Sequence, residues 1–188
     1  MSDLSHPKPT TSASLITVEA TVLREIEASP EDVWRILTDL DNAKGMLPGV
    51  IEIERLEGPA YDVGTRWKET RRVFGVAASE VMEVTHVDPC RSTTVQAENR
   101  GVIYTTEFHL IPGDRFTVLS MSLLGEMRST SRESRALMAL SKPLTLAATK
   151  RAIARDLDAI AHVAEHAHQA GSALHELGFA DDANEENK

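Results

Sequence analysis

Three charged residues, Glu69, Arg71 and Glu80, stand out because the sequence places them on a face that should otherwise be apolar. The stretch 64–75, GTRWKETRRVFG, alternates with the period of a β-strand, so Trp67, Glu69 and Arg71 share one face. Unpaired charge is costly to bury, so this mixed face is unsuited to an ordinary core. Two carboxylates beside a guanidinium could orient a ligand's hydroxyl or keto group, or serve as acid and base.

The same charges have a second interpretation, a salt-bridged network at the end of a sheet or a twist that lets them reach solvent. Ion-pair networks also occur away from catalytic sites. Tyr104 adds a phenol that would need a hydrogen-bond partner if it were buried. The candidates for catalysis are therefore Glu69, Glu80, Arg71 and Tyr104, and both interpretations stay open at the level of sequence.

Turn signals between residues 50 and 124 predict how the strands pair. Tight hairpins are expected at 74–75, 88–89, 100–101 and 113–114, each of which contains Gly or Pro. The predicted partners are Trp67 with Met82, Glu69 with Glu80, Arg71 with Ala78, Val84 with Thr93, Met82 with Val95, Ala97 with Tyr104, Thr93 with Phe108, and Phe108 with Leu119. All four registers place one consistent set of side chains on the same face.

This shared face combines apolar and aromatic side chains with the few charges described above. Together with two residues of a final helix it is the predicted ligand-binding surface, made of Trp67, Glu69, Arg71, Glu80, Met82, Val84, Val95, Tyr104, Phe108, Leu119, Met121, Ile153 and Leu157. A flat or lipidic ligand could stack on such a wall. The same side chains could equally form an ordinary core.

Other elements must position this face. A first strand alternates through Val18 to Ile26, and a helix follows with Ser29 as N-cap and Pro30 at its first position. A second short turn or helix covers 41–49. A polar connection over 125–142 leads to a long final helix from Pro143 to about His168, with an apolar stripe through Leu146, Ile153, Leu157, Ile160 and Ala164. The predicted class is α+β, with a seven-stranded curved antiparallel sheet wrapped around the long C-terminal helix.

Length and composition favour one globular domain over residues 16–170, with flexible tails at 1–15 and 171–188. A net charge of −9 argues against a nucleic-acid partner. Cys90 is the single cysteine, and no apolar run approaches the ~20 residues that insert in a membrane, so a cytoplasmic location is expected.

His162 and His166 have metal-binding spacing without a third ligand, so neither a metal nor a cofactor is expected. Whether the chain forms a homodimer stays open.

Several phrases resemble the START and birch-pollen-allergen (SRPBCC) superfamily, in its polyketide cyclase/dehydrase and lipid-transport branch. IEASPEDVWRILTDLDNAKGMLPGV is similar to the opening of that branch, and GTRWKETRRVFG, EVMEVTHVDP and GVIYTTEFHLIPGDRFTVLSMSL are similar to its central strands. The resemblance covers roughly residues 17–168 and implies the helix-grip fold, in which the sheet and the last helix enclose a pocket.

The resemblance is specific for the fold and much less so for the function, because the superfamily includes carriers, cyclases, hydroxylase subunits and regulators. We expect binding of a hydrophobic small molecule, lipid-like or aromatic-polyketide-like, in the pocket. One alternative is a polyketide cyclase or dehydratase that uses the same pocket, and another is a non-catalytic protein-interaction module.

Overall fold

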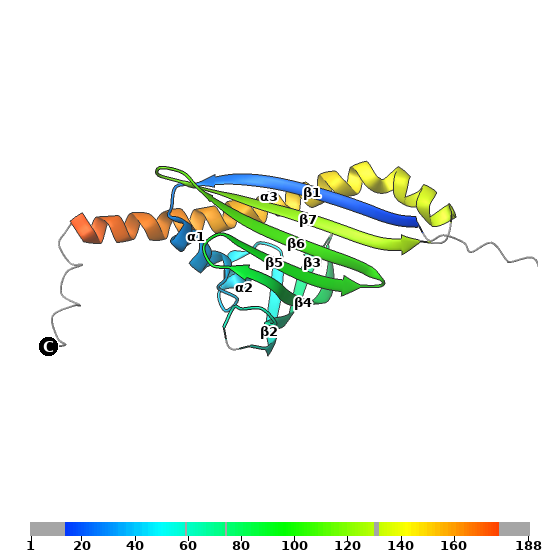
Figure 1. The fold of residues 1–188 in the computed structure, drawn as a ribbon, viewed down its shortest axis with the longest axis horizontal. Coiled ribbons are helices and arrows are strands. Elements are labelled where there is room, and N and C mark those ends of the chain that lie inside the picture. Colours follow the sequence, from blue (N-terminus) through cyan, green and yellow to red (C-terminus); the bar gives the residue numbers. More distant parts are fainter. Residues whose placement is uncertain (1–13, 59, 74, 130–131, 177–188) are drawn as a thin grey trace, which may run out of the picture.

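The computed structural model describes residues 14–58, 60–73, 75–129 and 132–176 (Figure 1). Its elements, in chain order, are β1 (Ser14–Ile26), α1 (Pro30–Leu37), α2 (Ala43–Met46), β2 (Val50–Glu57), β3 (Arg66–Val73), β4 (Val76–Asp88), β5 (Ser92–Asn99), β6 (Val102–Pro112), β7 (Thr117–Ser129) and α3 (Arg132–Glu176). The strands form one antiparallel sheet in the order β1-β7-β6-β5-β4-β3-β2. This arrangement confirms the predicted helix-grip fold.

Helix α1 begins where its sequence predicts. The Ser29 hydroxyl accepts a hydrogen bond from the backbone N–H of Asp32 at 3.1 Å, and Pro30 occupies the first turn, where no N–H is needed. The helix buries Val33 and Ile36. With α2 it lies beside α3 at one end of the sheet (Figure 1).

The strand registers agree with the prediction in two hairpins and differ from it in the other two. Trp67 pairs with Met82 and Ala97 with Tyr104, as expected. In the β4–β5 pair Asp88 lies opposite Ser92, so the predicted turn at 88–89 was too short and the register beside it is shifted by three residues. The irregularity between Val84 and His86 reduces the shift to two, which places Val84 opposite Val95. A shift of two residues is one full pleat repeat, so Val84 and Val95 keep their predicted face. Val87 lies beyond the irregularity and also packs against the inner cluster.

The β6–β7 hairpin shows a two-residue shift along its whole length. The chain turns over 113–116, with the Gly113 N–H donating to the Phe116 carbonyl at 2.8 Å, so that Pro112 pairs with Thr117. The predicted turn at 113–114 was too short. Phe108 therefore lies opposite Met121 instead of Leu119.

The long final helix begins earlier than predicted. Strand β7 continues to Ser129 because it pairs with β1 along its whole length, and α3 starts at Arg132 instead of Pro143. The expected polar connection over 125–142 is therefore the end of a strand followed by helix. The expected tails at 1–15 and 171–188 lie largely outside the described residues, within which β1 begins at Ser14 and α3 ends at Glu176.

Two buried clusters hold the described residues together. The larger joins α3, α1, β1 and the β6–β7 pair, and includes Ile26, Val33, Leu119, Leu157 and Ala164. The smaller consists of Leu40, Trp67, Val84 and Val95, with Tyr61 and Met82 packed against it. Within the described part of the chain, no helix is long and apolar enough to cross a membrane.

Candidate ligand cavity

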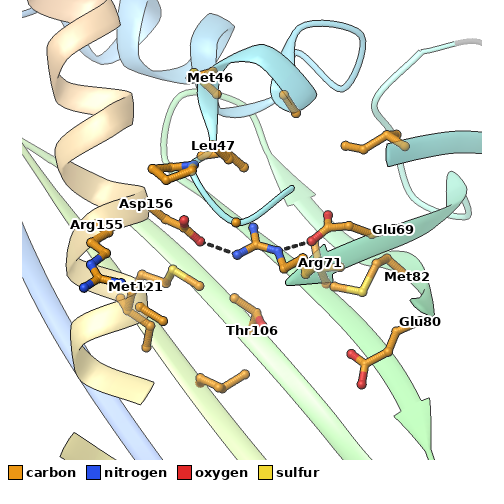
Figure 2. Close-up of a pocket in the computed structure, with 18 of the residues that line it drawn as sticks. Met46, Leu47, Glu69, Arg71, Glu80, Met82, Thr106, Met121, Arg155 and Asp156 are labelled. Carbon is orange, nitrogen blue, oxygen red and sulfur yellow. Dashed lines mark hydrogen bonds and ion pairs between the residues drawn. The ribbon is translucent and has the colours of Figure 1, made fainter. Parts of the chain in front are cut away.

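A cavity of about 720 Å³ lies between the sheet, α3 and α2. Side chains from both buried clusters line its walls, so the cavity borders the larger cluster on one side and the smaller cluster on the other. Most of the lining is apolar, from Leu37, Leu40, Ala43, Met46, Leu47, Ile53, Tyr61, Trp67, Met82, Val95, Phe108, Met121, Leu123, Ala148, Ala152, Ile153 and Ile160. The polar lining includes Glu69, Arg71, Glu80, Thr106 and Asp156 (Figure 2).

The polar lining is organised around the Arg71 guanidinium, which two carboxylates hold from opposite sides (Figure 2). Its Nε donates to Glu69 on the same strand, and its Nη1 donates to Asp156 Oδ2 of α3 at 2.6 Å. Glu69 also accepts a bond from the Trp67 indole at 3.3 Å. This group, Glu69, Arg71 and Asp156, is called the cavity triad below, and it connects the sheet to the helix.

Burial and charge act in opposite directions within the cavity triad. Asp156 is only 7% exposed, and desolvation raises its pKa above the usual value, although Arg71 opposes the shift. Burial alone would lower the pKa of Arg71, but the charges of Glu69 and Asp156 outweigh it and raise that pKa. Arg71 is therefore a permanent cation shared by two carboxylates.

The raised pKa of Asp156 gives a stability prediction with a definite sign. The folded state holds the proton more tightly than the unfolded chain does, so the stabilisation from Asp156 is fully present below its ordinary value of 3.8 and is lost as pH rises through the folded pKa. Urea denaturation between about pH 3 and pH 7 measures how the difference in free energy of unfolding between the wild type and Asp156→Asn changes with pH. We expect the wild type to lose stability relative to the variant as pH rises. A change in the opposite direction would mean that the charge of Arg71 outweighs desolvation and lowers the pKa of Asp156.

Glu80 is the strand partner of Glu69, as the sequence predicted, but the two carboxylates have separate partners. Asn99 donates to Glu80 Oε1 at 2.9 Å, and Figure 2 shows Glu80 directed away from the cavity triad. The described side chains therefore contain an ion-pair network at Arg71 and a separate carboxylate at Glu80.

Residues 16–165 match the model of a family described as polyketide cyclase/dehydrase and lipid transport. The chain belongs to this polyketide cyclase/dehydrase and lipid-transport family. The resemblance inferred from sequence is thereby confirmed. No curated protein sequence matches the chain.

Several solved structures share the fold of this chain. TTHA0849 from Thermus thermophilus has a TM-score of 0.65 at 18% identity, over 79% of this chain and 98% of its own. A norcoclaurine synthase point mutant from Thalictrum flavum, in complex with a transition-state analogue, has a TM-score of 0.63 at 23% identity, covering 82% and 99%. The Zhui aromatase/cyclase from a Streptomyces species has a TM-score of 0.63 at 19% identity, covering 81% and 94%. At these identities the likeness establishes the fold alone.

In this member of the family, most of the predicted ligand-binding residues line the cavity. They are Trp67, Glu69, Arg71, Glu80, Met82, Val95, Phe108, Met121 and Ile153. Val84, Leu119 and Leu157 are completely buried in the two clusters instead, because neighbouring side chains cover them. The half-buried Tyr104 is outside the described cavity lining and lies against Gly125, its partner on β7.

The phenol of Tyr104 has a raised pKa in that position. Burial raises its pKa, and the negative charge of Glu80 adds to the shift. The ring lies over Gly125, where an added Cβ would lie 3.4 Å from it, an ordinary contact distance. Tyr104 is therefore placed beside the cavity and not in its wall.

Asp156 was not predicted as a cavity residue, although its position in the sequence indicates that it lies on the apolar side of the final helix. Asp156 follows Ile153 by three residues and precedes Ile160 by four, so helical spacing puts it on the apolar stripe. A carboxylate at such a position is a candidate for a buried partner of Arg71. Met46 and Leu47, which approach from α2, had no comparable local signal because only the tertiary fold brings them to the cavity.

Tyr61, also missed, joins the aromatic part of the wall. Its ring centroid lies 6.4 Å from Trp67 and 6.3 Å from Trp34, and its hydroxyl lies 3.1 Å from Thr93 Oγ1. Burial raises the pKa of Tyr61, although the bond to Thr93 opposes the shift. The loop between β2 and β3 therefore supplies a fixed aromatic side chain to the cavity.

Gly58 holds the start of the loop that carries Tyr61. It has φ +85°, and an added Cβ would lie 2.8 Å from Thr65 Oγ1 and 3.2 Å from Thr65 Cα, so a side-chain rotation cannot relieve the crowding. We expect Gly58→Ala to lower the free energy of unfolding by about 2 kcal/mol. Gly64→Ala, at φ +86° with open space, should lower it by about 1 kcal/mol in the same denaturation experiment. Equal losses would show that crowding at Gly58 is unimportant.

Proposed function

We propose that the chain binds a hydrophobic small molecule, lipid-like or aromatic-polyketide-like, in the cavity between the sheet and α3. The observation that carries the proposal is a cavity of about 720 Å³ whose walls are largely apolar and whose polar groups are few and mostly concentrated at the cavity triad. Typical small-molecule sites have this composition and a volume of about 300–1,000 Å³.

The walls suit a flat or an elongated apolar ligand. Trp67, Tyr61 and Phe108 offer aromatic surface for stacking, and the thioethers of Met82 and Met121 can adapt to different shapes. The cavity triad would then meet whatever polar group the ligand carries. A ligand in this space would touch the sheet, α2 and α3 at once.

Membership of the polyketide cyclase/dehydrase and lipid-transport family supports a small-molecule ligand. The Thalictrum flavum norcoclaurine synthase has been solved in complex with dopamine and hydroxybenzaldehyde, which makes it an example of the fold with small organic ligands. A protein-interaction module would be expected to have a filled interior, and the cavity favours the ligand-binding function over it. A cytoplasmic location and the absence of a nucleic-acid partner stay predictions from composition.

A cyclase or dehydratase activity is the second candidate, because Asp156 and Arg71 place a carboxylate of raised pKa beside a fixed cation inside the cavity. Arg71 could hold a keto oxygen while Asp156 exchanges a proton with the adjacent carbon. Much of the rate would come from holding a flexible substrate in a folded shape. Turnover of a poly-keto substrate by Asp156→Asn and by Glu80→Gln separates the roles: loss with the first substitution alone supports catalysis through the cavity triad.

Native mass spectrometry against a panel of lipids and aromatic polyketides tests the binding function. We expect a complex of one ligand per chain for at least one class, retained at low collision energy. If no compound of either class gives a complex above the level of a matched protein without a cavity, the proposal is wrong.

A further inference from the structure

The charges around the cavity are unevenly distributed between its interior and its rim. The interior holds the carboxylates of Glu69, Glu80 and Asp156, and Arg71 is the single cation among the described interior side chains. Two further arginines of the lining, Arg72 and Arg155, are exposed. Figure 2 shows Arg155 directed away from Arg71. The interior therefore carries more negative than positive charge.

Arg71 is already committed to two carboxylates and is poorly available to a ligand anion. A ligand carboxylate would have to displace Glu69 or Asp156, whose side chains are 11% and 10% exposed. The displaced carboxylate would stay buried without its cation, which is strongly unfavourable. The cavity triad thus opposes acidic ligands, although it contains an arginine.

Acceptor atoms, in contrast, are free to meet a ligand. Among the described residues, Asp156 Oδ1 and Glu80 Oε2 have no recorded donor, while the other oxygen of each carboxylate is bonded. Thr106 lines the same cavity at 8% exposure, and its hydroxyl likewise has no partner within the described part of the chain. These three atoms are accessible at the cavity surface and are not sealed within the protein, so a ligand that supplies donors can pair with them.

We propose that the natural ligand is an amphiphile with an aromatic or aliphatic body and a protonated amine, whose ammonium group lies against Asp156. This rests on the proposed binding function and specifies the ligand class for the same cavity. The ammonium donates to Asp156 Oδ1 and compensates the second carboxylate of the cavity triad. The body of the ligand lies on the wall of Trp67, Met82 and Phe108.

Three compounds of one shape test the ligand class: naphthylethylamine, naphthylethanol and naphthylacetate, titrated calorimetrically at neutral pH. We expect the amine to bind about tenfold more tightly than the alcohol, since a hydrogen bond to a charged group contributes about 1.5 kcal/mol or more. The acid should bind more weakly than the alcohol. If the alcohol binds as tightly as the amine, or the acid binds most tightly, the ligand class is wrong while the binding function stands. If none of the three binds while the panel of lipids and aromatic polyketides gives a complex, the ligand class is wrong and the binding function stands; if the panel also fails, both proposals are wrong.

Two charge-neutralising substitutions on α3 show whether the preference arises at the cavity triad. Asp156→Asn should reduce the amine's advantage over the alcohol by about tenfold. Asp158→Asn removes the same charge two residues away, where the side chain is 63% exposed and pairs with Arg24, and should leave the ratio unchanged. An equal effect of both substitutions would overturn the assignment. Glu80→Gln, which keeps the cavity triad intact, should lower the ratio less than Asp156→Asn, and circular dichroism verifies that each variant is folded.

Discussion

Replacing Arg71 with Met is expected to lower the free energy of unfolding by about 3 kcal/mol, because it leaves two buried carboxylates without their cation. Asp156 and Glu69 lose the guanidinium together, although Glu69 keeps its bond from the Trp67 indole, and neither carboxylate can move fully into water because α3 and the sheet enclose them. The Arg71 side chain is 31% exposed, so the effect should lie near the lower end for a broken buried pair. Urea denaturation at neutral pH measures it.

Lys68→Met is the matched control for Arg71→Met. Lys68 lies on the same strand but on the opposite, exposed face, where its ammonium is 3.8 Å from Glu54. The control should change stability by less than about 0.5 kcal/mol. The triple variant Glu69→Gln, Arg71→Met, Asp156→Asn should recover much of the lost stability, because no unpaired charge remains. If Arg71→Met costs no more than the control, the cavity triad is not a buried ion-pair network.

Filling the cavity with Thr106→Phe should weaken binding of a neutral hydrophobic probe, N-phenylnaphthylamine, by at least about tenfold, because the added ring takes space that a ligand needs. Thr106 lies on β6 in the cavity wall, opposite Leu123 of β7 (Figure 2 labels Thr106 among the lining residues). The variant should stay folded, because the ring enters empty space and does not overpack a filled core. Fluorescence titration of the probe measures the affinity.

Thr105→Phe is the corresponding control on the other face of β6. The Thr105 hydroxyl accepts a hydrogen bond from Gln96 at 3.3 Å on the exposed side of the sheet, away from the cavity. Affinity for the probe should therefore equal that of the wild type. Equal weakening by both phenylalanines would show that the probe binds elsewhere or that the fold has changed.

Most of the fold was predictable because alternation and turn residues determine which face each strand presents. In the two incorrect hairpins the residues beside the cavity were shifted by two positions, which left them on their predicted face, whereas the irregularity after Val84 changed the face of Val87. The start of α3 was not predictable in the same way. Residues 125–142 are polar. Composition alone does not distinguish a polar helix from a polar loop, because tertiary pairing and packing decide between them.

Local periodicity was enough to predict which residues of a strand face the cavity. It was not enough to predict which of those residues neighbouring side chains cover. Strand alternation placed Trp67, Glu69 and Arg71 on the inner face, and the structure puts all three in the cavity wall. Val84 and Leu119 have the same apolar character as lining residues but are covered completely, and that depends on how the sheet curves around α3. Local sequence does not specify this curvature.

A crystal structure of the chain soaked with N-phenylnaphthylamine tests the central claim most directly. We expect density for one probe molecule inside the cavity, in contact with Trp67 and Phe108 and bounded by α3. A cavity filled by its own side chains, or a probe bound only to the outer surface, would contradict the claim that this fold encloses a binding site for a hydrophobic small molecule.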